Sequence, residues 1–200
     1  MKNDNLNEYL AVISPDERVS SDVMEMKLRC KEKFGSTSAI YSRAHLTIFN
    51  IIQPALNEER LIKCLERNIE KINPFKINLN GIDNFSNNSA VLYVKLEDEK
   101  EFYDLSQNIR EFTRSVLKSI KGYPPRFTYK GHITIAKDIP NAIFPKVWES
   151  LKNLEYQSST TASGIVLLKR PFTYLSSSYE VVGNYSFLGK GHFDPQMSLF

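Results

Sequence analysis

The chain has 200 residues, of which 42% are hydrophobic and 24% are charged, and this composition is ordinary for a globular protein with a sizeable core. The formal net charge of +3 permits a phosphate or nucleic-acid ligand without requiring one, and a non-specific nucleic-acid binder usually has a denser basic footprint. No stretch approaches the roughly 18 apolar residues of a membrane span, and the start MKNDNLNEYL lacks a signal-peptide core, so we expect a cytoplasmic protein with no membrane partner.

In the first half of the chain, apolar periodicity predicts three strands and two helices. The first helix follows Pro15 and Asp16, with Ser14 as its N-cap and Gly35 as its stop. The second helix has Asn57 as its cap and runs to about residue 72. The strands are expected at 9–14, 44–50 and 75–82, and the cluster NFSNNS is expected to form a turn after the third.

The second half of the chain repeats this order. The expected elements are a strand at 90–96, a long helix at 98–121, a strand at 131–137, a helix around Val147, Trp148 and Leu151, and closing strands near 160–170 and 178–188. The order β-α-β-α-β thus occurs twice, although the two halves share almost no sequence identity. We therefore predict one domain of two similar, intertwined lobes, 9–82 and 90–188, followed by an irregular tail at 189–200.

Each predicted repeat carries the same four-residue pattern on its middle strand: histidine, an aliphatic residue, threonine and a second aliphatic residue. The two copies are HLTI at 45–48 and HITI at 132–135. Alternate residues of a strand point to the same face, so the histidine and threonine of each copy project together and the aliphatic residues point into a core. Two such strands facing each other would place two imidazoles and two hydroxyls around one pocket.

This set of side chains suits phosphodiester cleavage without a metal. One imidazole can deprotonate the attacking oxygen and the other can protonate the leaving oxygen, although the sequence does not distinguish the acid from the base between His45 and His132. The Thr47 and Thr134 hydroxyls can bind the non-bridging phosphoryl oxygens. The chain has no acidic cluster of the two-metal nuclease type, and its two cysteines lack metal-site spacing, so we predict neither a metal nor a cofactor.

The segments HLTIF and GHITIAK, the order of strands and helices, and the closing pair of strands resemble the 2H phosphoesterase superfamily. That superfamily includes the 2′-5′ RNA ligases and the 2′,3′-cyclic nucleotide phosphodiesterases. The resemblance covers residues 9–188 and implies an α+β fold of two pseudo-symmetric lobes. Each lobe would have an antiparallel-rich sheet with helices on its outer face, and the active-site cleft would lie between them. It also implies that His45 and His132 are the acid–base pair and that Thr47 and Thr134 bind the phosphate.

One position departs from the family pattern. Many ligase-type members have an arginine three residues after the second threonine, where this chain has Lys137, which keeps the charge but loses the bidentate fork. Further substrate contacts could come from residues just before the two motifs. Their side chains could stack on a base or attract a phosphate, or they could lie on loop surfaces without contacting the substrate. These residues are Tyr41, Arg43, Tyr129 and Lys130. The third histidine, His192, has no threonine partner and is expected at the surface.

The leading hypothesis is a monomeric phosphoesterase that cleaves 2′,3′-cyclic phosphates or 2′-5′ linkages of an RNA end or a nucleotide, with 2′-5′ RNA ligation as a possible reverse reaction. A second hypothesis keeps the chemistry but takes a small metabolite as substrate, such as an ADP-ribose cyclic phosphate. A third is a non-catalytic module that binds RNA or a nucleotide. Retention of both histidines and both threonines argues against the third hypothesis.

Overall fold

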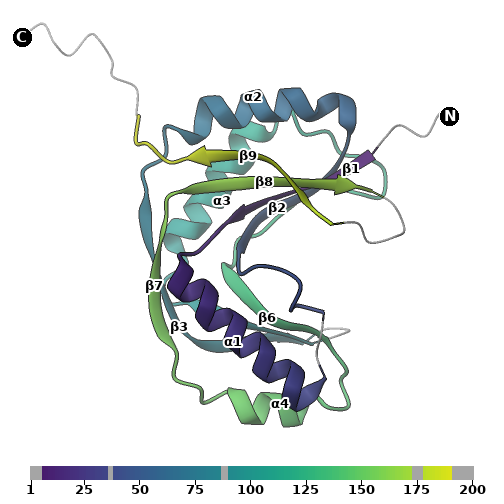
Figure 1. Cartoon of the computed structure of the whole chain (residues 1–200). Coiled ribbons are helices and arrows are strands. Elements are labelled where there is room, and N and C mark those ends of the chain that lie inside the picture. Colours follow the sequence, from purple (N-terminus) through teal and green to yellow (C-terminus); the bar gives the residue numbers. More distant parts are fainter. Residues whose placement is uncertain (1–5, 36–37, 87–89, 173–177, 191–200) are drawn as a thin grey trace, which may run out of the picture.

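A computed structural model describes residues 6–35, 38–86, 90–172 and 178–190 of the chain (Figure 1). Its strands are β1 (Leu6–Ile13), β2 (Leu46–Pro54), β3 (Phe75–Ser86), β4 (Ala90–Leu96), β5 (Arg126–Phe127), β6 (His132–Ile139), β7 (Gln157–Ala162), β8 (Gly164–Pro171) and β9 (Glu180–Ser186). Its α-helices are α1 (Glu17–Phe34), α2 (Glu58–Ile69), α3 (Lys100–Thr113) and α4 (Phe144–Leu151), and a 3-10 turn (Ala55–Asn57) precedes α2.

The nine strands form one sheet in which all pairs are antiparallel. The order is β7-β3-β4-β6-β2-β1-β8-β9, and the short β5 pairs with β2. At the centre, β2 and β6 pair only through Leu46 and Ile133. Outward from this junction, the strand order has four strands on each side, and β5 is an additional partner of β2; β6 and β2, which carry or directly follow the two histidines, are innermost. The α+β class and the antiparallel pairing are confirmed, although the strands form one sheet rather than two, and the division into two lobes and two repeats stays an interpretation.

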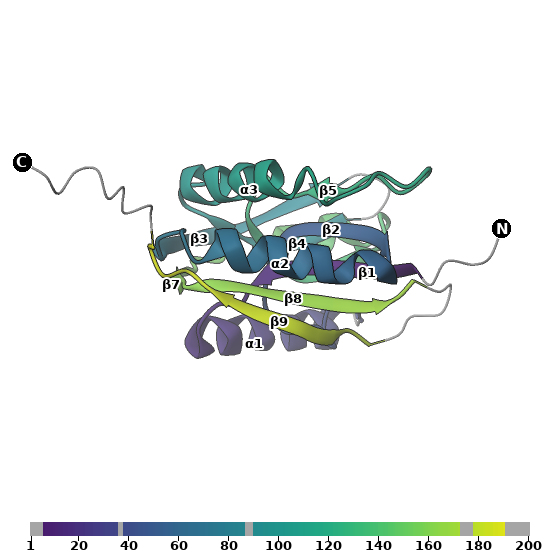
Figure 2. The same cartoon turned by 90° about the horizontal axis from the view of Figure 1, so that it is seen from above.

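The helices cover different parts of this sheet. Helix α1 packs against β6 and β7, whereas α2 packs against β9 and α3 (Figure 1). Seen from above, α1 and α3 lie on opposite sides of the strands (Figure 2). The buried side chains of helices and strands form one hydrophobic cluster that runs through both halves of the sheet. This continuous core holds the central junction in place.

The start of α1 corrects the predicted N-cap. The Asp16 carboxylate, and not Ser14, accepts a hydrogen bond of 2.9 Å from the backbone N–H of Val19. An aspartate three residues before an unpaired helical N–H satisfies that donor directly. Gly35 ends the helix as predicted, with φ of 70°, a left-handed conformation that favours glycine. Asn57 precedes α2, but its side chain makes no capping hydrogen bond; its amide nitrogen donates to the side-chain oxygen of Gln53.

Two predicted elements differ in length. Helix α3 ends at Thr113, well before 121, and the Thr113 hydroxyl there bonds back to the carbonyl of Ile109 at 2.6 Å. The predicted strand 160–170 is two strands, because the chain leaves β3 at Ala162 and joins β1 from Gly164 onward. Gly164 lies so close to the Tyr185 carbonyl that a Cβ atom would not fit.

Smaller differences concern ends of elements. Helix α2 ends at Ile69, and the predicted turn cluster begins inside β3, which continues to Ser86. Residues 87–89 of that cluster lie outside the described part of the chain. In the described ranges, no helix is both long enough and apolar enough to cross a membrane.

Candidate active site

The two histidine motifs meet at the centre of the sheet. His132 is the first residue of β6, and His45 directly precedes β2. Leu46 is paired with Ile133, and one step forward along an antiparallel strand is one step back along its partner. Continued by one residue on either side of this pair, the register would set His45 opposite Thr134 and Thr47 opposite His132. Side chains directly opposite each other in an antiparallel pair lie about 5 Å apart at Cβ, so we expect the four polar side chains to form one group across the junction.

Burial of the two motifs follows the predicted alternation. The aliphatic residues Leu46, Ile48, Ile133 and Ile135 are buried. The histidines and threonines between them are half-buried. The core side of the junction is therefore apolar, and the opposite side presents the two imidazoles and two hydroxyls together. That arrangement is the one the alternating sequence predicts.

Each imidazole is held through the same hydrogen bond. The Nδ1 of His45 is 2.8 Å from the carbonyl of Arg43, and the Nδ1 of His132 is 2.9 Å from the carbonyl of Lys130. A carbonyl can only accept, so Nδ1 carries the proton in both rings. The neutral form then keeps its lone pair on Nε2. Both histidines thus offer the same ring nitrogen for proton transfer, and the backbone two residues upstream sets that tautomer.

His132 packs against an aromatic and charged cluster from the neighbouring strands. Its ring meets the Phe85 ring edge-on at 5.1 Å and the Tyr93 ring at 5.2 Å. The Lys130 ammonium lies 5.4 Å and 5.5 Å from the centres of those two rings. Asp83 accepts from the Tyr93 hydroxyl at 3.1 Å and from Lys130 at 3.4 Å. These contacts fix the segment whose carbonyl orients His132.

The surroundings of His45 are cationic. Burial lowers the pKa of His45, and the positive charges of Lys27 and Lys137, together with His132, lower it further against the opposing effect of the Arg43 carbonyl. Burial is also the main cause that lowers the pKa of His132, with a smaller contribution from Lys130. Each lowered pKa favours a neutral imidazole. An anion bound among these groups would interact favourably with their positive charges and would therefore raise the pKa of both imidazoles.

A family model for the 2′-5′ RNA ligase superfamily matches residues 15–171 of the chain. The chain belongs to this superfamily. No curated protein sequence gives a significant match. The resemblance to the 2H phosphoesterases, drawn from the two motifs, is therefore confirmed at the level of the superfamily.

Solved structures share the fold at low sequence identity. TT0787 of Thermus thermophilus is 17% identical with a TM-score of 0.69, over 92% of this chain and 99% of that one. LigT of E. coli, complexed with 3′-AMP, is 13% identical with a TM-score of 0.62, over 92% and 98%. Usb1 of Kluyveromyces marxianus is 10% identical with a TM-score of 0.52, over 90% and 98%. At these identities the likeness establishes the fold.

The other residues that the sequence predicts to contact the substrate divide into two groups. Lys137 lies close enough to lower the pKa of His45, and Arg43 and Lys130 reach the histidines through their carbonyls. Tyr41 is 89% exposed, and Tyr129 contacts Arg110 at 3.1 Å and the Tyr103 ring. For these two tyrosines, substrate contact stays a prediction. His192 lies outside the described residues.

Sequence reasoning missed four residues around the histidines: Lys27, Asp83, Phe85 and Tyr93. A signal for Lys27 was available, because it follows Val19 and Val23 at intervals of four on the buried side of α1. The other three could not be found in this way, since they reach His132 only through the pairing of β3, β4 and β6.

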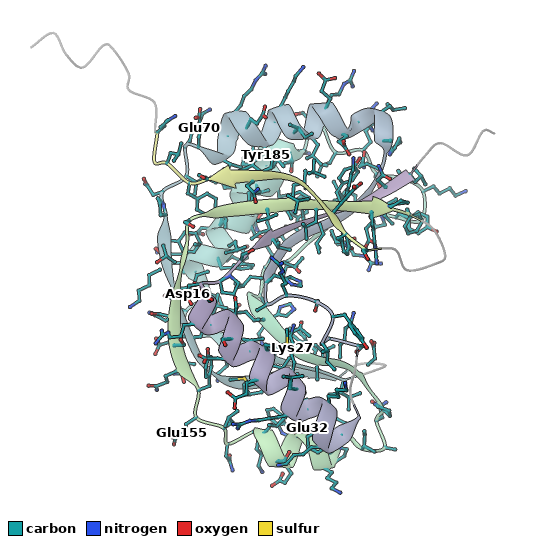
Figure 3. All side chains as sticks on the ribbon, viewed as in Figure 1. Asp16, Lys27, Glu32, Glu70, Glu155 and Tyr185 are labelled. Carbon is teal, nitrogen blue, oxygen red and sulfur yellow. The ribbon has the colours of Figure 1, made fainter. Side chains whose placement is uncertain are left out.

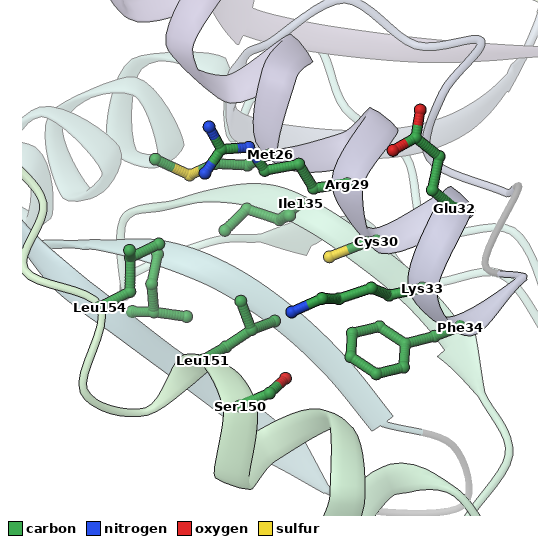
Figure 4. Close-up of a pocket in the computed structure, with 11 residues that line it drawn as sticks. Met26, Arg29, Cys30, Glu32, Lys33, Phe34, Ile135, Ser150, Leu151 and Leu154 are labelled. Carbon is green, nitrogen blue, oxygen red and sulfur yellow. The ribbon is translucent and has the colours of Figure 1, made fainter.

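A cavity of about 360 Å³ lies between α1 and α4 and is separate from the histidines (Figure 4). Its lining is largely apolar and includes Cys30, Phe34, Leu151 and Ile135. Ile135 belongs to the second motif but points away from Thr134, so this cavity lies on the core side of β6. Across the described ranges, His, Cys, Asp and Glu side chains do not gather in groups of three that could hold a metal ion.

Proposed function

We propose that this protein is a metal-independent phosphodiesterase that cleaves 2′,3′-cyclic phosphates or 2′-5′ linkages of RNA or nucleotides. We propose further that the same site carries out 2′-5′ ligation, in which a 5′-hydroxyl takes the place of the attacking water on a 2′,3′-cyclic phosphate and the bond from phosphorus to the 3′-oxygen breaks. The observation that supports this proposal is the pairing of Leu46 with Ile133 between β2 and β6, because an antiparallel register continued from this pair would set each histidine across from the threonine of the other strand. A phosphoryl group held by two hydroxyls would have an Nε2 atom on each side.

The chemical step follows from this geometry. One neutral imidazole takes the proton from an attacking water, whose oxygen forms the new bond to phosphorus. The bond from phosphorus to the ribose oxygen breaks. The other imidazole, which starts protonated, gives that oxygen its proton. The Thr47 and Thr134 hydroxyls donate hydrogen bonds to the non-bridging oxygens as charge develops. The charge of His132 contributes to the lowered pKa of His45, and the direction of the reaction decides which of the two imidazoles is the base.

The test is a panel of cyclic mononucleotides, RNA ending in a cyclic phosphate, and 2′-5′-linked oligonucleotides, assayed in EDTA with the products resolved. We expect turnover by the wild type and a loss of about 1,000-fold in His45→Ala and in His132→Ala. His192→Ala is the matched control and should retain full turnover. Turnover that persists in both single variants at the motifs would refute the mechanism.

The same panel separates the alternative functions. A net charge of only +3 suits a small ligand as well as RNA, so an ADP-ribose cyclic phosphate belongs in the panel. Faster turnover of that compound than of the RNA end would identify a metabolite phosphodiesterase. RNA or nucleotide binding without turnover, unchanged in both histidine variants, would instead identify a non-catalytic binding module.

A further inference from the structure

Lys27 is a buried lysine in the middle of an apolar helix face. It shares the buried side of α1 with Val19, Val23 and Cys30, and only 2% of its surface is exposed. Figure 3 marks its place on the helix. Lysine is almost never buried to this extent without a carboxylate partner, because the charged form loses its hydration. In the described part of the chain, no carboxylate lies within ion-pair distance of Lys27.

The Lys27 ammonium is bonded instead to the turn that leads into the first motif. Its Nζ donates to the carbonyl of Ser42 at 2.6 Å and contacts the Ser42 hydroxyl at 3.4 Å. That hydroxyl donates to the Ala39 carbonyl at 2.9 Å. The next residue after Ser42 is Arg43, whose carbonyl orients the His45 ring. Lys27 therefore fixes the peptide directly before the group that sets the tautomer of His45.

The charge of Lys27 also acts on the site directly. It is one of the positive charges that lower the pKa of His45, and it faces Lys137 as well. The titratable groups linked to it in this way are Lys137 and His45, and His132 also acts on His45; all of them are cationic or can become so. A bound phosphate would place negative charge beside these residues.

We infer that Lys27 is a positioning residue of the phosphodiesterase site, which holds the Ser42–Arg43 backbone for His45 and contributes positive charge for an anionic ligand. This inference rests on the proposed function, and it extends the site from the two motif strands to α1. Its burial has a functional explanation, since a buried cation that weakens the free protein is compensated when the anion binds.

The test compares Lys27→Met with the wild type. Methionine fits the apolar face of α1 and removes both the charge and the hydrogen bond. We expect the pKa of His45, followed by NMR titration of its ring, to rise, because a nearby cation is lost. We also expect weaker binding of inorganic phosphate and a fall in kcat/KM on a cyclic phosphate of about 10- to 100-fold. The Tm should stay unchanged or rise, which a purely structural role would not produce.

Two further variants complete the comparison. Lys27→Arg keeps the charge and should retain the low pKa of His45. Lys31→Met removes an exposed lysine one turn further along α1 and should match the wild type in every measurement. If Lys27→Met fails to fold, Lys27→Gln replaces it. A folded charge-removing variant with wild-type His45 titration and phosphate affinity would overturn the inference. Absence of wild-type turnover would refute only the proposed function, because both binding and titration remain measurable.

Discussion

At the scale of single residues, the site depends on two imidazoles whose protons are placed by the backbone. Each ring donates from Nδ1 to a carbonyl two residues upstream. This local geometry needs no carboxylate partner of the kind that orients histidine in many hydrolases. Two backbone carbonyls therefore orient the rings in place of a side chain. The surroundings of each ring then determine the pH at which it takes up its second proton.

The pH dependence follows from the lowered pKa values of His45 and His132. Both lie below the ordinary 6.5, so near neutral pH the free protein holds both rings mostly neutral, and the singly protonated pair increases toward acid. A bound anionic substrate would raise both pKa values. We expect the optimum of kcat/KM below pH 6.5 and the optimum of kcat at higher pH, as measured in steady-state profiles. A kcat optimum on the acidic side of the kcat/KM optimum would contradict this prediction.

The threonine hydroxyls give a second prediction at this scale. Thr47→Ala and Thr134→Ala each remove one proposed donor to the phosphoryl oxygens and should lower kcat by about 100-fold. Thr47→Ser and Thr134→Ser keep the hydroxyl and should retain most of the activity. Thr161→Ala, on the exposed side of β7, is the control. Equal losses in the serine and alanine variants would show that packing of the methyl group, and not the hydroxyl, matters.

At the scale of elements, apolar periodicity predicted most strands and helices because their buried faces are regular. It failed where a tertiary choice decides the structure. One long helix was predicted over 98–121 because its apolar residues continue at helical spacing through Val116. The helix ends at Thr113 instead, and Val116 still packs on the core. The run around Ala162 reads as one strand, yet it changes partner from β3 to β1. Local sequence does not encode which strand will be the neighbour.

The N-terminus of α1 offers a direct test of a local interaction. Asp16→Ala removes the acceptor for the Val19 N–H and should lower the free energy of unfolding by about 1 kcal/mol, whereas Asp16→Asn should lower it less. Ser14→Ala should have no such effect, because Ser14 does not cap the helix. Urea unfolding measures all three variants. A larger loss for Ser14→Ala than for Asp16→Ala would restore Ser14 as the cap.

At the scale of the whole molecule, the site exists only where the two halves of the sheet join. The motifs could be found in the sequence, and their alternation predicted which side chains share a face. Their mutual register could not be predicted, since it depends on one pair, Leu46 and Ile133, in the middle of nine strands. The residues that support the histidines come from α1, β3 and β4, so the entire fold contributes to a site of four side chains.

The buried charge of Lys27 should be visible in the stability of the whole protein. Burial, aided by Lys137, lowers its pKa from 10.5 to about 8. Below about pH 8, the folded and unfolded forms are both protonated and the folded protein bears the full cost of burying the charge. Between about pH 8 and 10.5 the unfolded form holds more protons, so the free energy of unfolding rises with pH. The shift in pKa corresponds to about 3 kcal/mol.

Comparison with Lys27→Met isolates this effect, because the variant has no titrating group at residue 27. Buried tyrosines such as Tyr9 and Tyr185, whose pKa values rise to about 12, destabilise both proteins alike at high pH and cancel in the difference. We expect Lys27→Met to be the more stable protein near neutral pH, with its advantage shrinking by up to about 3 kcal/mol as the pH approaches 10.5. Urea unfolding at several pH values measures this difference. A difference that stays constant with pH would mean that Lys27 is solvated in the folded protein.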